Sequence, residues 1–335
     1  MNCWGEFLLS CGTGNASNQA GVSAFQNEQL QPWFEAPKSP PVSWWAYTEC
    51  VKLHKIQVRR ITLPLPELTA EVERLSLVIE IGGMAVRVKT TDPGFLDMLQ
   101  NRYDGFVSSA ALAEIEFDVD LTQPRFADPE AEVSVIHRLG RWSFRRGDFL
   151  AEWDPVSRSG RIRQSANPYS IDAVLRIAHT LMLAKQGGFL MHSASAIRNG
   201  KAFLFAGVSG AGKTTISRLA PPDATLLTDE ISYVRRQDDG YVAFGTPFTG
   251  ELAKLGENVS APIAALYLLA QGPENRMDSI PPSEAARSLL ANVLFFAEDE
   301  ELVQSTFHSA LEFVGRVPVS RLTFVPDSRV WELIG

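Results

Sequence analysis

Residues 207–214, GVSGAGKT, constrain the fold of this chain more than any other segment. They follow an apolar run, AFLFA at 202–206, and precede TISRLA, where a helix is expected. The pattern GxxxxGKT between a strand and a helix indicates a phosphate-binding loop. Its glycines let successive backbone N–H groups point at an anion, and the helix N-terminus adds the positive end of its dipole. The segment therefore predicts a strand, a phosphate-binding loop and a helix in direct succession.

The expected ligand of this loop is a nucleoside triphosphate with magnesium. Lys213 can reach the β and γ oxygens, and the Thr214 hydroxyl can hold the Mg²⁺ that bridges them. The expected cofactors are therefore ATP and Mg²⁺, and the alternative is a glycine-rich turn that binds nothing. Thr215 is included at the edge of the set, although its position suggests helix surface. The predicted nucleotide-binding residues are Gly207, Val208, Ser209, Gly210, Ala211, Gly212, Lys213, Thr214 and Thr215.

Two adjacent acids, Asp229 and Glu230, end a short apolar segment at 225–228. An acid at the carboxyl end of a strand beside a phosphate loop can bind magnesium directly or through water, and a neighbouring acid can take a proton from an attacking hydroxyl. Adjacent strand residues face opposite sides, so the two acids are expected to differ in role. The alternative is an exposed strand end that leads into a turn.

One histidine, His192, lies in the apolar segment GFLMHSASAI at 188–197. The dipeptide Asn199-Gly200 predicts a hairpin turn that pairs this segment with the strand at 202–206. Such a hairpin is antiparallel, which favours a mixed sheet over an all-parallel one. By composition alone, a histidine in an apolar strand is more often a satisfied core residue than a catalytic one.

Taken in order, GFLMHSASAI, FAGVSGAGKTT and LLTDEISYV resemble the catalytic domain of the HPr kinase/phosphorylase family and its HPr kinase-related relatives, over roughly residues 165–250. The resemblance implies a mixed-sheet α/β P-loop kinase domain of the type shared with phosphoenolpyruvate carboxykinase. His192 precedes Gly207 by 207 minus 192, or 15, residues, which fits the family's arrangement. By resemblance, Asp229 would activate the acceptor hydroxyl with help from His192, and Lys213 would act on the phosphates. Glu230 and Thr214 would serve the magnesium site, with Asp229 as a further candidate ligand.

Some features depart from that family. Its second acid is an aspartate, whereas this chain has Glu230. No counterpart of the glycine-rich segment with its arginine follows the acids, and the first 130 residues do not resemble the usual N-terminal domain, so neither phosphorylase activity nor control of carbohydrate uptake is implied. The segment GTPFTGE at 245–251 resembles the kinase-related subgroup and offers Glu251 for the metal or acceptor site, against the alternative of a surface loop. Arg276 is a weaker candidate for a phosphate contact.

Composition suggests three segments. Residues 1–54, rich in Gly, Ser, Asn, Gln and Pro, are expected to form a tail or a loosely docked extension. Residues 55–130 alternate apolar and polar positions and predict a small α+β module. Residues 131–335 are expected to form the P-loop kinase domain. In this segment, β hairpins and a helix over 171–185 precede the phosphate-binding loop.

Charge and cysteine content limit the class of partner. The formal net charge of −8 gives no electrostatic footprint for nucleic acid or an anionic membrane. Cys3, Cys11 and Cys50 do not form a metal-ligand pattern, and no run of about 18 apolar residues occurs. A cytoplasmic protein is expected, with a protein or peptide as acceptor. Members of the resembling family often form homo-oligomers, but no segment here identifies a subunit interface.

The sequence leaves two other functions open. The first is a nucleotide-binding regulatory or interaction protein without transfer activity, which would not need the His192 and Asp229 pair. The second is a kinase for a small metabolite, because no segment defines the acceptor pocket.

Overall fold

The computed structural model describes residues 74–110, 112–123, 132–238, 240–296 and 299–335. All of these residues belong to one compact unit. The predicted tail, residues 1–54, and the three cysteines lie outside the described residues. Within the described part of the chain, no helix combines the length and the apolar composition that crossing a membrane requires.

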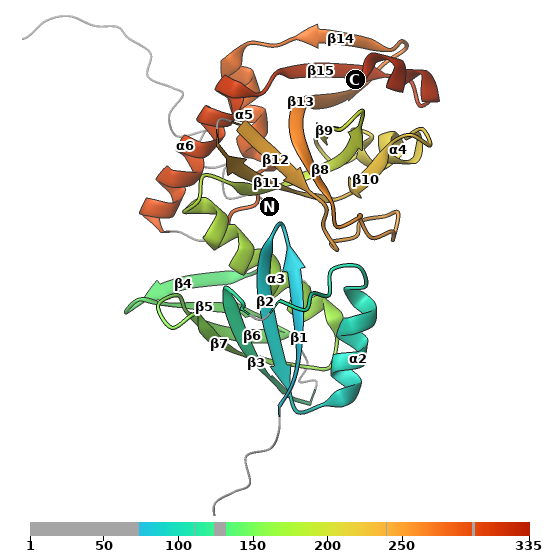
Figure 1. The fold of residues 1–335 in the computed structure, drawn as a ribbon. Coiled ribbons are helices and arrows are strands. Elements are labelled where there is room, and N and C mark those ends of the chain that lie inside the picture. Colours follow the sequence, from blue (N-terminus) through green and yellow to red (C-terminus); the bar gives the residue numbers. More distant parts are fainter. Residues whose placement is uncertain (1–73, 111, 124–131, 239, 297–298) are drawn as a thin grey trace, which may run out of the picture. The chain divides into compact units, whose positions relative to one another are not determined.

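Seven strands form the first sheet, in the order β1-β2-β3-β7-β6-β5-β4 (Figure 1). Neighbouring strands run antiparallel, except that β3 lies parallel to both β2 and β7. Helix α2, Pro93–Arg102, packs against β1 and β2 and begins at an Asp92 cap. The strands are β1 Leu75–Ile81, β2 Met84–Thr90, β3 Ile115–Leu121, β4 Ser134–Arg138, β5 Arg141–Arg146, β6 Phe149–Asp154 and β7 Ser159–Gln164.

The expected boundary between residues 130 and 131 falls inside this sheet. Strand β3 pairs with β7 over six positions, from Glu116 with Ser159 to Leu121 with Gln164. The hairpins of β4 to β7 therefore belong to the same sheet as β1 to β3. Alternation of apolar residues marks each strand, but it carries no information on which distant strand becomes its neighbour.

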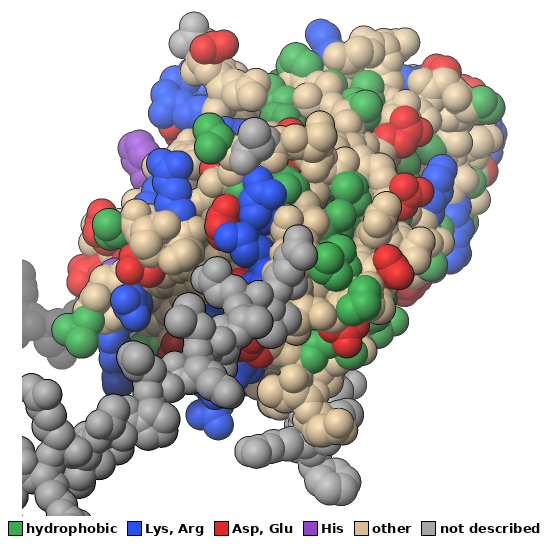
Figure 2. All heavy atoms as spheres, turned by 60° about the horizontal axis from the view of Figure 1, so that its bottom comes forward, with side chains coloured by type: hydrophobic (Ala, Val, Ile, Leu, Met, Phe, Trp, Pro, Cys, Tyr) green, Lys and Arg blue, Asp and Glu red, His purple; other side chains and the backbone are tan. Residues whose placement is uncertain are grey.

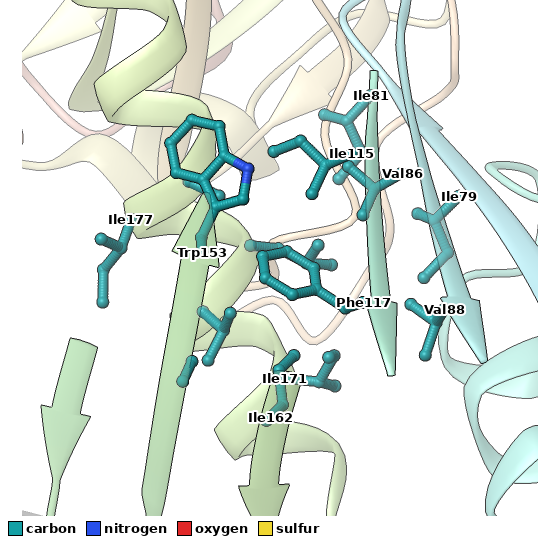
Figure 3. Packing of buried hydrophobic residues seen from close by; sticks show 14 of the residues in the cluster. Ile79, Ile81, Val86, Val88, Ile115, Phe117, Trp153, Ile162, Ile171 and Ile177 are labelled. Atoms are coloured by element: carbon teal, nitrogen blue, oxygen red, sulfur yellow. The ribbon is translucent and has the colours of Figure 1, made fainter. Parts of the chain in front are cut away.

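Helix α3, Pro168–Ala184, confirms the helix expected over 171–185. Asn167 caps its first turn, and Gly187, with a φ of 74°, lies just beyond its end. Most of its side chains are buried, so the helix contacts protein on several sides. Figure 3 shows Ile171 and Ile177 of α3 among buried residues of the first sheet, in the cluster that also includes Tyr233 of the second sheet.

The second sheet has eight strands and is mixed, as expected. Its main path is β10-β8-β11-β12-β13-β15-β14, and β9 pairs antiparallel with β8 and parallel with β13. The predicted hairpin between β8 and β9 is confirmed, with positive φ at Asn199 and Gly200. The strands are β8 Phe189–Arg198, β9 Lys201–Ala206, β10 Thr225–Thr228, β11 Ile231–Gln237, β12 Gly240–Phe244, β13 Ser260–Gln271, β14 Arg276–Ser279 and β15 Val319–Phe324.

The remaining helices cover the second sheet. Helices α5, Pro282–Asn292, and α6, Glu300–Arg316, contribute Leu289 and Phe313 to a buried cluster with residues of β8 and β9. The short helix α4, Lys213–Arg218, packs with the 3-10 helix η1, Ser328–Leu333, in a second cluster. Trp331 of η1 donates a hydrogen bond from Nε1 to the carbonyl of Ile216, at 3.1 Å, and so links η1 to the backbone of α4.

Charges of both signs are interspersed on the surface. On the face that Figure 2 shows, acidic side chains lie among the lysines and arginines. The first sheet has the same mixture, with Lys89 paired to Glu116 and Arg161 paired to Asp120. A hollow of about 800 Å³ on this sheet is bordered by Arg145, and its lining contains none of the predicted site residues.

Candidate phosphate-binding site

The glycine-rich loop joins the buried end of β9 to α4, as the sequence predicted. Gly210 and Gly212 have φ angles of 80° and 111°, which side-chain-bearing residues rarely adopt. A Cβ on Gly212 would lie 2.6 Å from Cζ of Phe324, whereas a Cβ on Gly210 would meet nothing within 4 Å. Gln271, the last residue of β13, donates from Nε2 to the carbonyl of Gly210 at 2.7 Å. The loop is thus held from β13 and β15, while the outer side of Gly210 stays open.

Lys213 is folded into this loop. Its Nζ donates to the carbonyl of Gly207 at 2.9 Å and lies 3.4 Å from the carbonyl of Val208, and the side chain is buried. Burial lowers the pKa of this ammonium, and the charges of Glu230 and Glu251 act against that shift. A partly desolvated cation that contacts only neutral carbonyls, within a loop open at Gly210, fits a phosphate group. Thr214 and Thr215 follow in the first turn of α4, both partly buried.

Asp229 is nearly fully buried and holds the loop that follows β12. Its Oδ1 accepts the N–H of Gly250 and its Oδ2 the N–H of Leu252, both at 2.9 Å. A Cβ on Gly250 would lie 2.9 Å from Oδ2, so this close approach requires glycine. The carboxylate therefore orders the segment that contains Glu251, and each oxygen keeps a lone pair for a further contact.

Glu230 has different surroundings from Asp229. It is half-buried, and its Oε2 lies 3.7 Å from Nη2 of Arg176 on α3. Burial raises the pKa of Glu230, an effect that Arg176 opposes and the neighbouring charge of Asp229 reinforces. The two adjacent acids thus differ in environment, although their catalytic and metal-binding roles remain predictions.

His192 lies on β8, where it pairs with Ile231, the residue after Glu230. Its side chain is exposed, so it does not fill the core position that composition alone favoured. Desolvation by the surrounding protein lowers the pKa of its imidazole, and the positive charges of Lys213 and Arg176 lower it further. The ring is consequently neutral at neutral pH and able to accept a proton.

Sequence reasoning missed a group of charged residues beside these acids. Asp172 of α3 accepts from Nη2 of Arg102 at 2.6 Å and from the hydroxyl of Tyr103, which both lie at the end of α2. Arg102 Nη1 also lies 3.4 Å from the hydroxyl of Thr249 in the loop after β12. The available signal was the spacing of Asp172 and Arg176, two charged residues one turn apart on a mostly apolar helix.

The remaining candidates are placed less directly. Glu251 is exposed and close enough to Lys213 to affect its pKa. Arg276 pairs with Asp278 at 2.9 Å and with Glu274 at 3.4 Å, so its charge is already balanced. No group of three or more His, Cys, Asp or Glu side chains is arranged to hold a metal among the described residues. Mg²⁺ is usually bound by one or two carboxylates with phosphate oxygens and water, and so does not need such a group.

Comparison with known proteins identifies one family. Residues 168–335, which is 168 of 335 residues, match the family described as SynChlorMet cassette protein ScmC. The match begins at α3 and includes the loop, both acids and His192. No curated protein matches the chain. One similar solved structure is described as the Hpr(Ser) kinase/phosphatase from Coxiella burnetii; it shares 12% identity over 36% of this chain and 93% of that chain, with a TM-score of 0.20. A TM-score this low does not establish a common fold.

Proposed function

The chain belongs to the ScmC family of SynChlorMet cassette proteins, and from this premise we propose that it is an ATP-dependent kinase. The reaction is transfer of a phosphoryl group to a hydroxyl, with a serine of a small protein or peptide as the acceptor. The observation that carries the proposal is the buried Lys213 ammonium inside a glycine loop, where its Nζ donates to the carbonyl of Gly207 at 2.9 Å. A loop of this kind positions a triphosphate through its backbone amides and its lysine.

The residues of the loop bind the nucleotide in this proposal. On phosphate binding, Lys213 exchanges its two loop carbonyls for phosphate oxygens, which are stronger, charged acceptors. Thr214 and Glu230 would hold Mg²⁺, which supplies neutralising charge on the phosphates when bound. The raised pKa of Glu230 is consistent with a carboxylate that gains stability when a cation arrives.

The acceptor hydroxyl is activated by Asp229, assisted by His192. The hydroxyl proton passes to this base, its oxygen forms a bond to the terminal phosphorus, and the bond from phosphorus to the oxygen of the ADP leaving group breaks. His192 is exposed and neutral, so it can accept a hydrogen bond or a proton from a group that arrives from solvent. Catalysis then rests on positioning and charge stabilisation.

A second candidate function is a nucleotide-binding regulator without transfer activity. The observation that favours it is the use of both Asp229 oxygens to hold the amides of Gly250 and Leu252. An acid with this structural task can order a partner-binding loop in response to nucleotide, and no proton transfer is then required.

The test is ATP binding by calorimetry and ADP release with Mg²⁺, for the wild type and two variants. Lys213→Ala is expected to weaken ATP binding about 100-fold, because it removes a charge-assisted contact worth roughly 3 kcal/mol. Asp229→Asn is expected to retain binding and lose turnover. Lys201→Ala, at the exposed opposite end of β9, is the matched control and should behave as wild type.

Two results would contradict the kinase. If the wild-type protein binds no ATP, or if the Lys213→Ala variant binds ATP normally, the glycine loop is not the ATP-binding site. Asp229→Asn that turns ATP over at the wild-type rate would instead favour the regulator.

A further inference from the structure

Helix α3 carries one cation, Arg176, whose position its packing does not explain. The side chain is partly buried on a helix whose other residues are mostly buried and apolar. Arginine is rarely buried without a partner, because removing its charge from water costs free energy that a close anion usually offsets. The position therefore needs a reason other than the stability of the core.

The contacts of Arg176 leave hydrogen-bonding capacity unused. Its ion pair with Glu230 is 3.7 Å long, which is beyond hydrogen-bond distance, and its Nε is buried without a hydrogen-bond partner. The guanidinium carbon lies 4.8 Å from the centre of the Phe248 ring, a contact that orients the group without using its N–H donors. One turn away, Asp172 is already bound to Arg102 and Tyr103. Arg176 is thus held in place but not neutralised at close range.

Arg176 shares its electrostatic surroundings with the candidate site. Glu230, whose Oε2 lies 3.7 Å from Arg176, precedes Ile231, the residue that pairs with His192 across β11 and β8. The charges of Lys213 and Arg176 both add to the effect of desolvation in lowering the pKa of the His192 imidazole. Arg176 of α3 and Lys213 at the glycine loop therefore both act on the imidazole of His192. An anion bound by Lys213 that extends toward His192 would approach the free donors of the guanidinium.

We propose that Arg176 is a catalytic residue that donates hydrogen bonds to the phosphoryl group during transfer. This inference rests on the proposed function. In phosphoryl transfer, negative charge is spread over three equatorial oxygens, and a planar guanidinium can contact two of them at once. Glu230 and Phe248 would orient the group before substrate arrives, so little rearrangement is needed in the transition state.

The experiment compares MgADP binding with and without fluoroaluminate, which mimics a phosphoryl group in transfer and needs no acceptor. Wild-type protein should bind MgADP, and more tightly with fluoroaluminate. Arg176→Ala should bind MgADP within about twofold of wild type and lose at least about 30-fold of the tightening, since arginines in this role contribute about 10³ or more to the rate. Arg176→Lys should lose less, and added guanidinium should restore part of the effect in Arg176→Ala. Arg138→Ala, an exposed arginine of β4, is the charge-matched control.

The outcomes separate the two proposals. If wild-type protein does not bind MgADP, the proposed function fails, and this inference fails with it. If wild-type protein binds MgADP but fluoroaluminate tightens binding equally in Arg176→Ala, or not at all in either protein, only the role of Arg176 is overturned. If both Arg176 variants lose MgADP binding itself, Arg176 is needed for folding or for nucleotide binding. That result would also overturn its proposed role in phosphoryl transfer.

Discussion

At the residue scale, two glycines of the loop differ in what a side chain would meet. Both have positive φ, but only Gly212 faces the Phe324 ring. Gly210→Ala should cost about 1 kcal/mol through backbone strain alone. Gly212→Ala should cost roughly 3 kcal/mol, because overpacking against the ring adds to the strain. It should also weaken MgADP binding, since Lys213 is the next residue. Urea denaturation and calorimetry measure both effects.

Comparing Gly210→Ala with Gly212→Ala also separates two reasons for a glycine in the loop, namely backbone freedom alone and a lack of space for a side chain. Equal losses in Gly210→Ala and Gly212→Ala would show that only backbone freedom matters, contrary to the contact with Phe324. The motif itself was predictable, because it depends on residues adjacent in the sequence. The ring that restricts Gly212 was not, because Phe324 lies 324 minus 212, or 112, residues further along the chain.

At the element scale, Arg102 links helix α2, which packs on the first sheet, to the loop after β12. Arg102 bridges Asp172 and Thr249, and the next residue of that loop, Gly250, binds Asp229. Arg102→Ala should destabilise the fold by roughly 3 kcal/mol, because it leaves the buried Asp172 carboxylate without its cation. It should also speed hydrogen exchange at the Gly250 and Leu252 amides.

A milder variant isolates the loop contact. Thr249→Val removes the hydroxyl near Arg102 and leaves the Asp172 ion pair intact. It should speed the same amide exchange with little loss of stability. Unchanged exchange at Gly250 and Leu252 in both variants would mean that α2 does not influence the loop.

These links explain which elements the sequence could predict. The β8–β9 hairpin, α3 and α4 follow local signals, namely a turn dipeptide, apolar periodicity and glycine or proline at the ends. The partnership of Arg102 with Asp172 joins positions 70 apart, and that with Thr249 joins positions 147 apart. The pairing of β3 with β7, which lies across the expected boundary at 130/131, has no local signature either.

At the scale of the whole molecule, one buried cluster joins the first sheet, α3 and part of the second sheet. His179 lies at this junction, fully buried on α3, with Nδ1 3.0 Å from the hydroxyl of Tyr233 on β11. Burial, with a smaller effect from Arg235, lowers the pKa of His179 to about 3. The unfolded chain therefore binds a proton at a pH where the folded chain does not. Stability should be full above the unfolded pKa near 6.5 and fall as pH decreases toward 3.

The size of this effect gives the last prediction. Between pH 7 and 5, His179 should remove about 2 kcal/mol of stability, with a slope that approaches about 1.4 kcal/mol per pH unit below the unfolded pKa. His179→Phe loses the Tyr233 hydrogen bond at every pH, so it should be less stable at pH 7, but its stability should decline less steeply on acidification. Urea denaturation from pH 7 to 5 measures both slopes, with His308→Phe on the exposed face of α6 as the control.

Because His179 lies between the two sheets, a single transition monitored by probes in each sheet would show that they unfold together. Identical slopes for wild type and His179→Phe would mean that this junction opens to water before the rest of the molecule unfolds.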